Sequence, residues 1–340
     1  MSDGKRMTSG GRAVGRMICG AMSAAFAVGA LVGVVARLLP MRLSALPYVP
    51  NIVAATPWFG LVAAVALLFA VLGRRRVLTS LAVACLILVS YWQAPFFANA
   101  VREESPSSRS TSSGTTLRVM TCNVYKGRAD AAQIVKLVRE QKVQVLTLQE
   151  TTADFVNRLD EAGIAKYLPY AKTASADGVY GNGAWSARPL ANAVRDEVQS
   201  SASQMPAGTV SLGGGRTLRF VSVHTTAPVA GYWNQWKRSL DELAAMKSVG
   251  GGTYVFMGDF NATYDHAPFR NVLGDRFTDA ARSAGRGLTF TWPANRTVLP
   301  PMFGIDHIVM DRGVSASDLE VHRIEGTDHA ALLATLRVGE

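Results

Sequence analysis

The sequence contains little cysteine, which excludes a fold that depends on disulfides. Its three cysteines are Cys19, Cys85 and Cys122. The first two lie in strongly apolar segments, so an internal disulfide is excluded in the more polar remainder of the chain. Because Cys122 falls in a predicted buried strand, we interpret it as a small apolar core residue rather than a catalytic thiol.

Charged residues are missing from three long stretches near the amino terminus. The stretches cover residues 17–36, 52–73 and 77–98, and each is close to the roughly 20 residues that a helix needs to cross a bilayer. Core helices of a soluble domain are also apolar, but three such runs are hard to bury together. We therefore predict a membrane anchor with three transmembrane helices over residues 1–100. The two spans after the first favour an anchor over a cleaved signal peptide.

Basic residues flank these stretches unevenly. Four of them precede the first stretch, and Arg74, Arg75 and Arg76 form the turn between the second and the third, whereas the loop between the first two holds only Arg37 and Arg42. The positive-inside rule then places the amino terminus in the cytoplasm. After three spans, the rest of the chain is expected outside the plasma membrane, so we predict a multi-pass protein with an extracytoplasmic domain.

Acidic residues are almost absent from the first 100 positions, which hold nine Lys and Arg but one Asp. The remaining positions hold 26 basic and 24 acidic residues, so the net charge of +10 belongs mostly to the anchor. Membrane topology explains this excess, and the nearly balanced remainder does not indicate a polyanion-binding surface. Nucleic acid is therefore a partner that the charge does not favour.

The chain after the anchor divides into a linker and a folded domain. Residues 101–116 are rich in serine and threonine, which is typical of a flexible linker. Residues 117–340 show strand patterns interleaved with amphipathic helices. Strands are expected at 117–124, 143–148, 218–223, 254–257, 305–310 and 331–338, and helices at 131–140, 152–162 and 232–246. This alternation predicts an α/β layered domain with its helices outside the sheets.

Polar residues follow most of these strands, where an α/β scaffold usually carries its chemistry. In chain order they are Asn123, Glu150, His224, Asp259, Asn261, Asp306, Asp328 and His329. Carboxylate and amide oxygens are ligands for hard divalent cations, and amides and histidines can donate hydrogen bonds to phosphate. The series therefore predicts metal-dependent cleavage of a phosphate ester.

Three of these residues also have a structural interpretation when each is considered alone. Glu150 could stabilise the amino terminus of the helix expected from Thr152. Asn123 and His224 could be ordinary strand-end side chains. The hypothesis of a site therefore depends on the complete series rather than on any one member.

Asp259 and Asn261 belong to the motif Gly-Asp-Phe-Asn at 258–261. Two residues apart in extended backbone, their side chains would share a face, so that one can orient a water molecule and the other can hold a phosphate oxygen. A plain turn is the alternative interpretation, but the motif directly follows an apolar strand.

The remaining histidines are interpreted as structural. They are His266, His307 and His322. His307 follows Asp306 on a predicted strand, so its side chain should point to the opposite face of the sheet.

The motifs that contain these residues resemble those of a known superfamily. They are Thr-Cys-Asn at 121–123, Gln-Glu at 149–150, Val-His-Thr at 223–225, Gly-Asp-Phe-Asn at 258–261, Ile-Asp-His at 305–307 and Thr-Asp-His at 327–329. In this order they resemble the endonuclease/exonuclease/phosphatase (DNase I-like) superfamily, which includes DNase I, exonuclease III, neutral sphingomyelinases and inositol polyphosphate 5-phosphatases. The resemblance implies a four-layer α/β/β/α sandwich over nearly all of 117–340.

The resemblance also implies a metal site. The glutamate that matches Glu150 binds Mg²⁺ or Mn²⁺ in the family. Asn123 is placed beside both the metal and the phosphate, and Asp328 is the acidic residue near the metal.

Catalytic roles follow from the resemblance in the same way. Asp259 would position or deprotonate the attacking water, and Asn261 would bind the phosphate. His329, oriented by Asp306, would contact a phosphoryl oxygen as an imidazolium. His224 would be a phosphate ligand or an acid toward the leaving group. The implied phosphate-binding residues are thus Asn123, Asn261, His224 and His329.

The sequence departs from the DNase I-like branch at one motif. Residues 181–189 read Gly-Asn-Gly-Ala-Trp-Ser-Ala-Arg-Pro, so Arg188 stands before Pro189 where that branch has a glutamate that partners the residue matching His224. This weakens the expectation of DNase I-like activity, and Arg188 could bind an anion or be an ordinary surface arginine. Residues 291–293, Thr-Trp-Pro, resemble bacterial membrane-anchored members.

The expected function is hydrolysis of phosphate esters outside the plasma membrane by a membrane-tethered, metal-dependent phosphodiesterase or phosphatase. Lipid-linked or other extracytoplasmic phosphate esters rank first as substrates, and tethering beside a bilayer favours the lipid-linked ones. An extracellular DNA or RNA endonuclease is the alternative, although it would need a basic groove lined with aromatic residues. A non-catalytic membrane receptor that retains the fold comes third, since a binding protein does not need Glu150, Asp259 and His329 together.

Overall fold

The computed structural model describes residues 9–98 and 115–339. The chain forms two compact units, the first made of Met1–Pro40 and Asn51–Ala94 and the second of Met41–Pro50 and Pro95–Glu340. Residues 101–114 of the predicted linker lie outside the described residues, and the last two predicted linker residues already belong to a strand that begins at Thr115.

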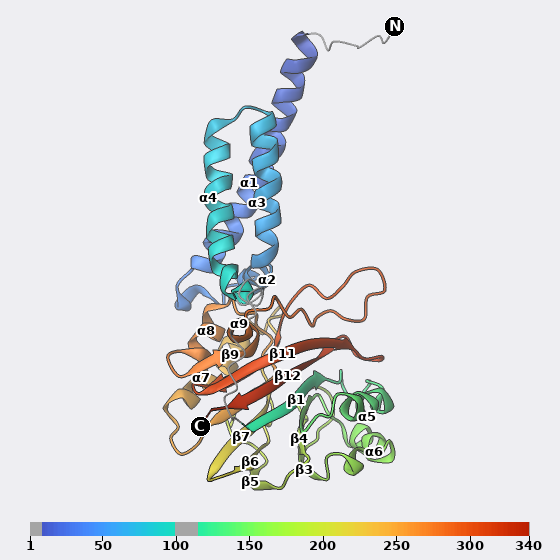
Figure 1. Cartoon of the computed structure of the whole chain (residues 1–340). Helices are drawn as coiled ribbons and strands as arrows, with labels where there is room; N and C mark the ends of the chain where they lie inside the picture. The colour runs from blue at the N-terminus through green and yellow to red at the C-terminus, as the bar shows by residue number, and fades with distance from the viewer. Residues whose placement is uncertain (1–8, 99–114, 340) are drawn as a thin grey trace, which may run out of the picture. The chain divides into compact units, whose positions relative to one another are not determined.

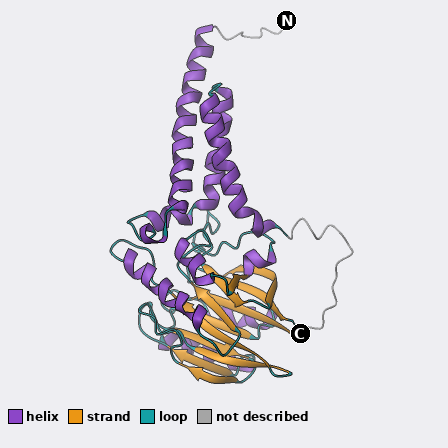
Figure 2. Cartoon of the chain, turned by 90° about the vertical axis from the view of Figure 1, so that its left-hand side faces the viewer, coloured by secondary structure: helices purple, strands orange, loops and turns teal. Residues whose placement is uncertain are grey.

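The first unit contains helices that run side by side (Figure 1, Figure 2). They are α1 (Ser9–Leu38), α3 (Thr56–Leu72) and α4 (Arg76–Gln93). The short helix α2 (Val49–Ala54) and the 3₁₀ helix η2 (Ala94–Phe97) each contain residues of both units. Among the described residues, Gly11–Leu38 and Arg76–Phe97 are long and apolar enough to cross a membrane. Thr56–Leu72 is apolar as well but has 17 residues.

The prediction of one continuous helix over 52–73 is wrong. The structure interrupts it at Ala55, between α2 and α3, and Pro57 lies in the first turn of α3. A proline has no N–H and its ring clashes with the carbonyl four residues earlier, which here is that of Val53. The hydroxyl of Thr56 donates to this carbonyl instead, at 2.7 Å.

The second unit contains two six-stranded sheets. The first has the order β11-β12-β1-β2-β4-β3 and consists of β1 (Thr115–Asn123), β2 (Val145–Gln149), β3 (Tyr170–Ala174), β4 (Asn182–Ser186), β11 (Val314–Arg323) and β12 (Ala330–Val338). The second has the order β5-β6-β7-β8-β10-β9 and consists of β5 (Leu190–Val194), β6 (Ala207–Gly213), β7 (Arg216–His224), β8 (Tyr254–Asp259), β9 (Phe277–Asp279) and β10 (Asp306–Asp311).

The helices of this unit lie between the strands in sequence. They are α5 (Ala131–Glu140), α6 (Ala153–Glu161), α7 (Trp233–Ala244), α8 (Ala267–Leu273) and α9 (Ala280–Ala284), with 3₁₀ turns η1 (Met41–Leu43), η3 (Ile164–Lys166) and η4 (Ala245–Ser248). The predicted helix at 131–140 is confirmed at both ends. Asp130 caps its amino terminus by accepting a hydrogen bond from the Gln133 N–H. The helices predicted at 152–162 and 232–246 and all six predicted strands also form, with ends that shift by up to two residues.

Several elements escaped prediction, namely β3, β4, β5, β6, β9, β11, α8 and α9. They lack the long apolar runs or clear periodicity on which the prediction depended. For example, β11 has mostly exposed or half-buried side chains, and its pairing with β12 shifts register between Ser317 and Glu320.

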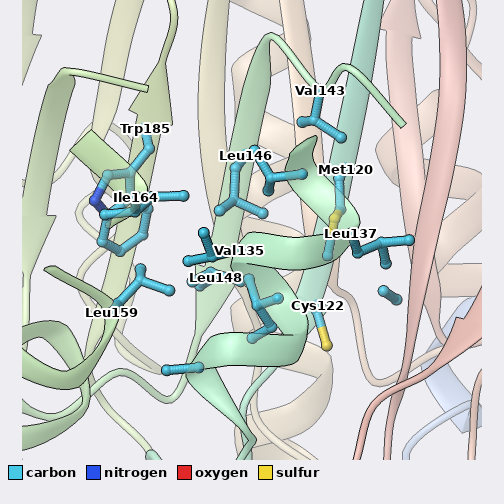
Figure 3. Close-up of a cluster of buried hydrophobic side chains, with 14 of the residues drawn as sticks. Met120, Cys122, Val135, Leu137, Val143, Leu146, Leu148, Leu159, Ile164 and Trp185 are labelled. Atoms are coloured by element: carbon cyan, nitrogen blue, oxygen red, sulfur yellow. The ribbon is translucent and has the colours of Figure 1, made fainter. Parts of the chain in front are cut away.

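Three apolar clusters show how the layers pack. One fills the space between the first sheet and helices α5 and α6, and it includes Met120, Cys122 and Leu148 (Figure 3). A second lies between the other sheet and helices α7 and α8. A third fills the space between the two sheets. The unit is thus an α/β two-sheet sandwich with helices on both outer faces, as expected.

Cys122 is fully buried in the first cluster. Burial raises the pKa of its thiol well above the usual value, and the nearby carboxylates of Asp306 and Asp328 raise it further. The thiol is therefore neutral and inaccessible, so the structure confirms that Cys122 is a core residue.

Alternation along the strands makes the space between the sheets polar at one end. Successive strand residues point to opposite faces. On β1 the inward series therefore passes from Leu117 and Val119, which belong to the inter-sheet cluster, to Thr121 and finally Asn123. On β7 it passes from Leu218 and Phe220 to Ser222 and His224, and β8 and β10 follow the same pattern. The apolar layer stabilises the sandwich, and its polar end forms the candidate site.

Candidate active site

Strand register brings the predicted residues of the second sheet into one row. Asp259 on β8 lies directly opposite Asp306 on β10 and His224 on β7. In the first sheet, Asn123 on β1 lies opposite Gln149, and Glu150 follows at the end of β2. Because these rows lie at the same end of the two facing sheets, side chains that are far apart in sequence meet.

Gly258 allows β8 and β7 to approach closely beside this row. Its φ is +152°, and a Cβ atom there would lie 2.0 Å from the carbonyl oxygen of Val223. An L-residue with a side chain would push the strands apart, so only glycine fits immediately before Asp259.

The amide of Asn123 connects the two acidic residues of the site. Its Nδ2 donates to Glu150 Oε1 at 3.1 Å and to Asp259 Oδ2 at 3.0 Å. Its Oδ1 accepts from the N–H of Tyr125 at 2.9 Å, which fixes the orientation of the amide. All three side chains of this group, Asn123, Glu150 and Asp259, are buried.

A local turn aims backbone donors at Glu150. Tyr125 and Lys126 have positive φ values of 46° and 55°, and the N–H of Lys126 donates to Glu150 Oε2 at 2.9 Å. Glu150 itself has a φ of 58°, which is uncommon for a residue with a side chain. The strained backbone at this point holds a buried carboxylate at the end of the sheet, as conformational strain often does at functional sites.

His329 contacts Asp306, the residue that the family resemblance implies as its partner. Its Nδ1 lies 2.9 Å from Asp306 Oδ2, and its Nε2 lies 3.6 Å from Asp259 Oδ2. Burial alone would lower the pKa of His329, but the carboxylates of Asp306 and Asp259 raise it to about 10. The ring is therefore an imidazolium at neutral pH, donating to Asp306 and directing its other N–H toward the site.

Asp259 has an environment suited to accepting a proton. Its Oδ1 accepts from the N–H of Asn261 at 2.8 Å. Burial raises the pKa of Asp259 above its usual range, while the positive charge of His329 opposes this effect. A carboxylate whose pKa is moved toward neutrality is a better general base.

His224 uses a backbone carbonyl where the DNase I-like branch would use glutamate. Its Nδ1 lies 2.9 Å from the carbonyl oxygen of Val179 and therefore carries the proton, because a carbonyl only accepts. Its Nε2 lies 3.8 Å from Glu150 Oε1 and 3.7 Å from Asp259 Oδ2. The carbonyl orients the ring without adding a negative charge.

Asn261 does not continue the extended backbone assumed from the sequence. Strand β8 ends at Asp259, and Asn261 adopts a φ of 46° in a turn closed by its hydrogen bond to Asp259. The turn forms because the aspartate side chain satisfies the N–H two residues later. Asn261 Nδ2 donates to the Thr225 carbonyl, and its own carbonyl accepts from Trp236 Nε1, both at 2.9 Å.

Asp328 lies beside the Thr-Trp-Pro segment. Its Oδ2 accepts from Trp292 Nε1 at 3.0 Å, whereas its buried Oδ1 has no protein partner. The neighbouring Thr327 hydroxyl donates to the Asn123 carbonyl at 2.7 Å and accepts from the His329 N–H. Trp292 and Thr327 therefore position Asp328 and His329 next to the end of β1.

Two groups of oxygen atoms could receive a cation. Within the described residues, one ligand atom from each of Asp259, Asp306 and His329 lies within 4.8 Å of the others. A protonated His329 has no lone pair to offer, however, so this group acts better as a hydrogen-bonded acid–base set. Glu150 and Asp259 on either side of the Asn123 amide form the other group, whose buried carboxylates offer the oxygen ligands that Mg²⁺ prefers.

Sequence reasoning missed the polar network that supports the site from between the sheets. Gln149 Nε2 donates to Ser222 Oγ at 3.0 Å, which links β2 to β7, and its Oε1 accepts from the Thr121 hydroxyl at 3.2 Å. On the same face of the sheet, the Thr147 hydroxyl donates to the Thr121 hydroxyl. Polar residues at every second position near the strand ends were the signal for this network.

The remaining predicted positions lie away from the site. Arg188 follows Ser186, which pairs with Val145 at the opposite end of the sheet, and its guanidinium donates to the Ser211 carbonyl. His307 points to the outer face, as expected, and contacts Asp279 at 2.8 Å. His322 bonds to Glu320 on β11.

A family model provides the comparison that decides membership. The model of the endonuclease/exonuclease/phosphatase family matches residues 120–329, which is more than half of the chain. The chain belongs to the endonuclease/exonuclease/phosphatase family. The matched segment begins on β1 and ends at His329, so it contains every residue of the site described above.

Several solved structures share the fold of the second unit. D. rerio TDP2 complexed with a single-strand DNA product is 18% identical, with a TM-score of 0.54 over 65% of this chain and 99% of that one. An AP endonuclease from Archaeoglobus fulgidus is 15% identical, with a TM-score of 0.53 over 64% and 98%. A family protein from Beutenbergia cavernae is 18% identical, with a TM-score of 0.51 over 66% and 72%. No curated protein matches the chain.

Proposed function

We propose that this protein is a divalent-metal-dependent phosphodiesterase or phosphatase. The observation that carries the proposal is the meeting of Glu150, Asp259 and His329 around the Asn123 amide. Family members are typically metal-dependent phosphoesterases. A protein that only bound a ligand would gain nothing from burying these carboxylates beside an imidazolium.

The donor set fits Mg²⁺ or Mn²⁺. Glu150 would be the main ligand, with Asn123 beside it, and the unpartnered Oδ1 of Asp328 is a further oxygen on the His329 side. When bound, the cation would polarise a phosphoryl oxygen and neutralise charge that develops there.

The protein's own residues would divide the remaining work. Asp259 would take a proton from the attacking water, and the Asn261 N–H keeps its carboxylate oriented. His329 would donate from Nε2 to a phosphoryl oxygen, where its positive charge stabilises the transition state. His224, oriented by the Val179 carbonyl, would bind phosphate or donate to the leaving group, and the Asn261 amide would help to bind the phosphate.

We also propose that the site works outside the plasma membrane on a chain tethered by three membrane-spanning helices. Two of the described helices are long and apolar enough to span, and α3 is apolar along its length. The basic residues before and within the first turns of α1, and those at the turn that leads from α3 into α4, favour a cytoplasmic amino terminus. Tethering beside a bilayer favours lipid-linked phosphates as substrates.

Nuclease activity is the second candidate. Structures that share the fold include TDP2 with a single-strand DNA product and an AP endonuclease. The near balance of charge after residue 100 argues against a nucleic-acid groove and ranks this candidate lower.

Hydrolysis of bis(p-nitrophenyl) phosphate by the full-length protein in detergent tests the proposed function. We expect turnover with Mg²⁺ or Mn²⁺ that stops with EDTA. Glu150→Gln and Asp259→Asn should each lower kcat/KM by about 100-fold or more, whereas Glu161→Gln, an exposed glutamate on α6, should not. Turnover that survives EDTA would refute the metal assignment.

A further inference from the structure

Exposed apolar side chains of the sandwich collect at the end that carries the site. In residues 115–339, five large hydrophobic residues are more than half exposed, with fractions from 52% to 89%. They are Tyr180, Val229, Tyr232, Val298 and Leu299. The other three exposed ones, Tyr170, Val249 and Val321, have fractions of 42% or less and lie at the opposite end or on β11.

Topology places three of these five residues beside the site. Tyr180 adjoins Val179, whose carbonyl holds His224, and precedes β4 at its site end. Val229 and Tyr232 lie in the loop that follows His224. Each loop therefore leaves a strand next to a residue of the site and presents an apolar side chain to solvent.

Val298 and Leu299 lie on a loop that the rest of the fold holds in place. Trp292 and Phe303 pair across its base, and their rings are 5.9 Å apart. Arg323 at the end of β11 donates to the carbonyl of Leu299. The loop between α9 and β10 extends beyond the sheets (Figure 1), and Val298, at 89% exposed, is the most exposed large hydrophobic residue of the described chain.

The loop Met41–Pro50 adds a sixth apolar residue to the same border. This loop belongs to the second unit, and the carbonyl of Pro50 accepts a hydrogen bond from His266 Nε2 at 2.8 Å. The ring of Tyr48 lies 5.6 Å from that of Trp233, directly after Tyr232, and remains 66% exposed. In sequence, the loop joins α1 to the next apolar run, so a bilayer that holds these helices begins within a few residues of Tyr48.

We infer that Tyr48, Tyr180, Val229, Tyr232, Val298 and Leu299, here called the apolar rim, bind the surface of a lipid bilayer. Isolated apolar residues on a surface are ordinary, but a set that surrounds one polar site indicates a binding surface. Tyrosines together with aliphatic residues suit the boundary between headgroups and acyl chains. The rim would hold the apolar part of a lipid-linked ester while its phosphate enters the site, a role that rests on the proposed function.

Contact with lipid can be measured without any activity. A Val298→Cys variant in a Cys19→Ser background, carrying the environment-sensitive fluorophore NBD, is reconstituted into phosphatidylcholine nanodiscs with and without nitroxide-labelled lipid. We expect at least two-fold quenching by the nitroxide, and none for the matched Val249→Cys variant at the opposite end of the sheets. Absence of quenching at position 298 would refute the proposed contact between the apolar rim and lipid. A blue shift without quenching would also refute it and would indicate a protein partner or a second copy of this chain instead.

A chain-length series tests what the rim contributes to substrate choice. The full-length protein is assayed on p-nitrophenyl ethyl phosphate and p-nitrophenyl hexadecyl phosphate, which share a leaving group. We expect kcat/KM to be at least ten-fold higher for the hexadecyl ester. The double variant V298S/L299S should lose this preference, whereas Y170S/V249S, at the opposite end of the sheets, should keep it. Equal rates for both esters would overturn the substrate inference. Absence of hydrolysis of either ester would count against the proposed function, whereas the quenching experiment would still decide the lipid contact.

Discussion

At the scale of single residues, the site depends on which groups carry protons. Asp306 and Asp259 keep His329 protonated although it is buried, whereas the Val179 carbonyl fixes the tautomer of His224 without adding charge. Two histidines in one site thus have different partners at Nδ1. The difference follows from whether the acceptor at Nδ1 is a carboxylate or a carbonyl.

The pH dependence of activity should reveal the role of Asp306. The pKa of His329 is raised from its ordinary 6.5 to about 10, so the imidazolium persists as pH rises and is lost only near 10. In Asp306→Asn one of the negative charges that raise the His329 pKa is missing, so burial should lower this pKa. The basic limb of the kcat/KM profile should then move down by at least about one pH unit. Rates measured from pH 5 to 10 with saturating Mg²⁺ test this.

Asp279→Asn is the matched control for this experiment. Asp279 bonds to His307 at 2.8 Å, in the same way as Asp306 bonds to His329, but on the outer face of the sheet. The basic limb of the kcat/KM profile of Asp279→Asn should lie at the same pH as that of the unmodified protein. An unchanged limb in Asp306→Asn would mean that turnover does not depend on a protonated His329.

At the scale of elements, the turn after β8 is supported from outside the sheet. Trp236 on α7 donates to the Asn261 carbonyl, and its ring packs edge-on against His266 at 5.2 Å. His266 precedes α8, and its ring contacts the carbonyl of Pro50, the second residue of α2. Because its Nδ1 accepts from the Thr263 N–H, its Nε2 must carry the proton that it donates to Pro50. These contacts agree with the structural interpretation of His266 and show that it joins segments that are distant in sequence.

Stability should depend on the charge state of His266. Burial lowers the pKa of this histidine from 6.5 to about 4 despite its hydrogen bonds. The unfolded chain therefore takes up a proton first, and stability is lost as pH falls from 6.5 toward 4, by about 2 kcal/mol at pH 5. His266→Gln stays neutral, so its thermal unfolding temperature should fall less between pH 7.5 and pH 5 than that of the unmodified protein.

The corresponding control is His322→Gln on β11, which should leave this pH dependence intact. Both variants are compared as full-length proteins in the same detergent. If His266→Gln and the unmodified protein lost equal stability on acidification, His266 would not be the group that titrates.

At the scale of the whole molecule, the two compact units do not divide at a single point in the sequence. Met41–Pro50 belongs to the sandwich although it lies between apolar helices in sequence. In this segment, the Tyr48 ring contacts Trp233 on α7, and the Pro50 carbonyl accepts a hydrogen bond from His266. A soluble fragment cut at the predicted linker would therefore lack a segment that packs against the domain.

Protease added to intact cells should test the topology that we propose. We expect cleavage within residues 101–116, detected as a shorter carboxyl-terminal tagged fragment on a gel, because this segment would lie outside the cell. The fragment could stay bound to the rest of the chain, so its size rather than its release is the readout. Full-length protein that resists cleavage in intact cells but is cut after detergent lysis would place the domain in the cytoplasm.

Much of the fold followed from local patterns. The α5 boundaries, the six apolar strands and the order of the motifs are properties of short segments, since periodicity and capping act over a few residues. The break before Pro57 could also have been predicted, because a proline excludes the hydrogen bond that a continuous helix would need. The exposed strand β11 carried too weak a pattern to predict.

The sequence by itself determined which chemical groups this protein has and the order in which they occur. Only the tertiary structure decided that Asn123 and Asp259, 136 residues apart, meet at 3.0 Å, that Asp306 and Asp259 oppose each other across β10 and β8, and that Arg188 lies at the wrong end of its sheet. It also decided that His224 uses a carbonyl and that the exposed apolar residues gather around the site. The reason is physical: sequence patterns fix the face on which a side chain lies, whereas the register between strands and the loops between them fix its neighbours.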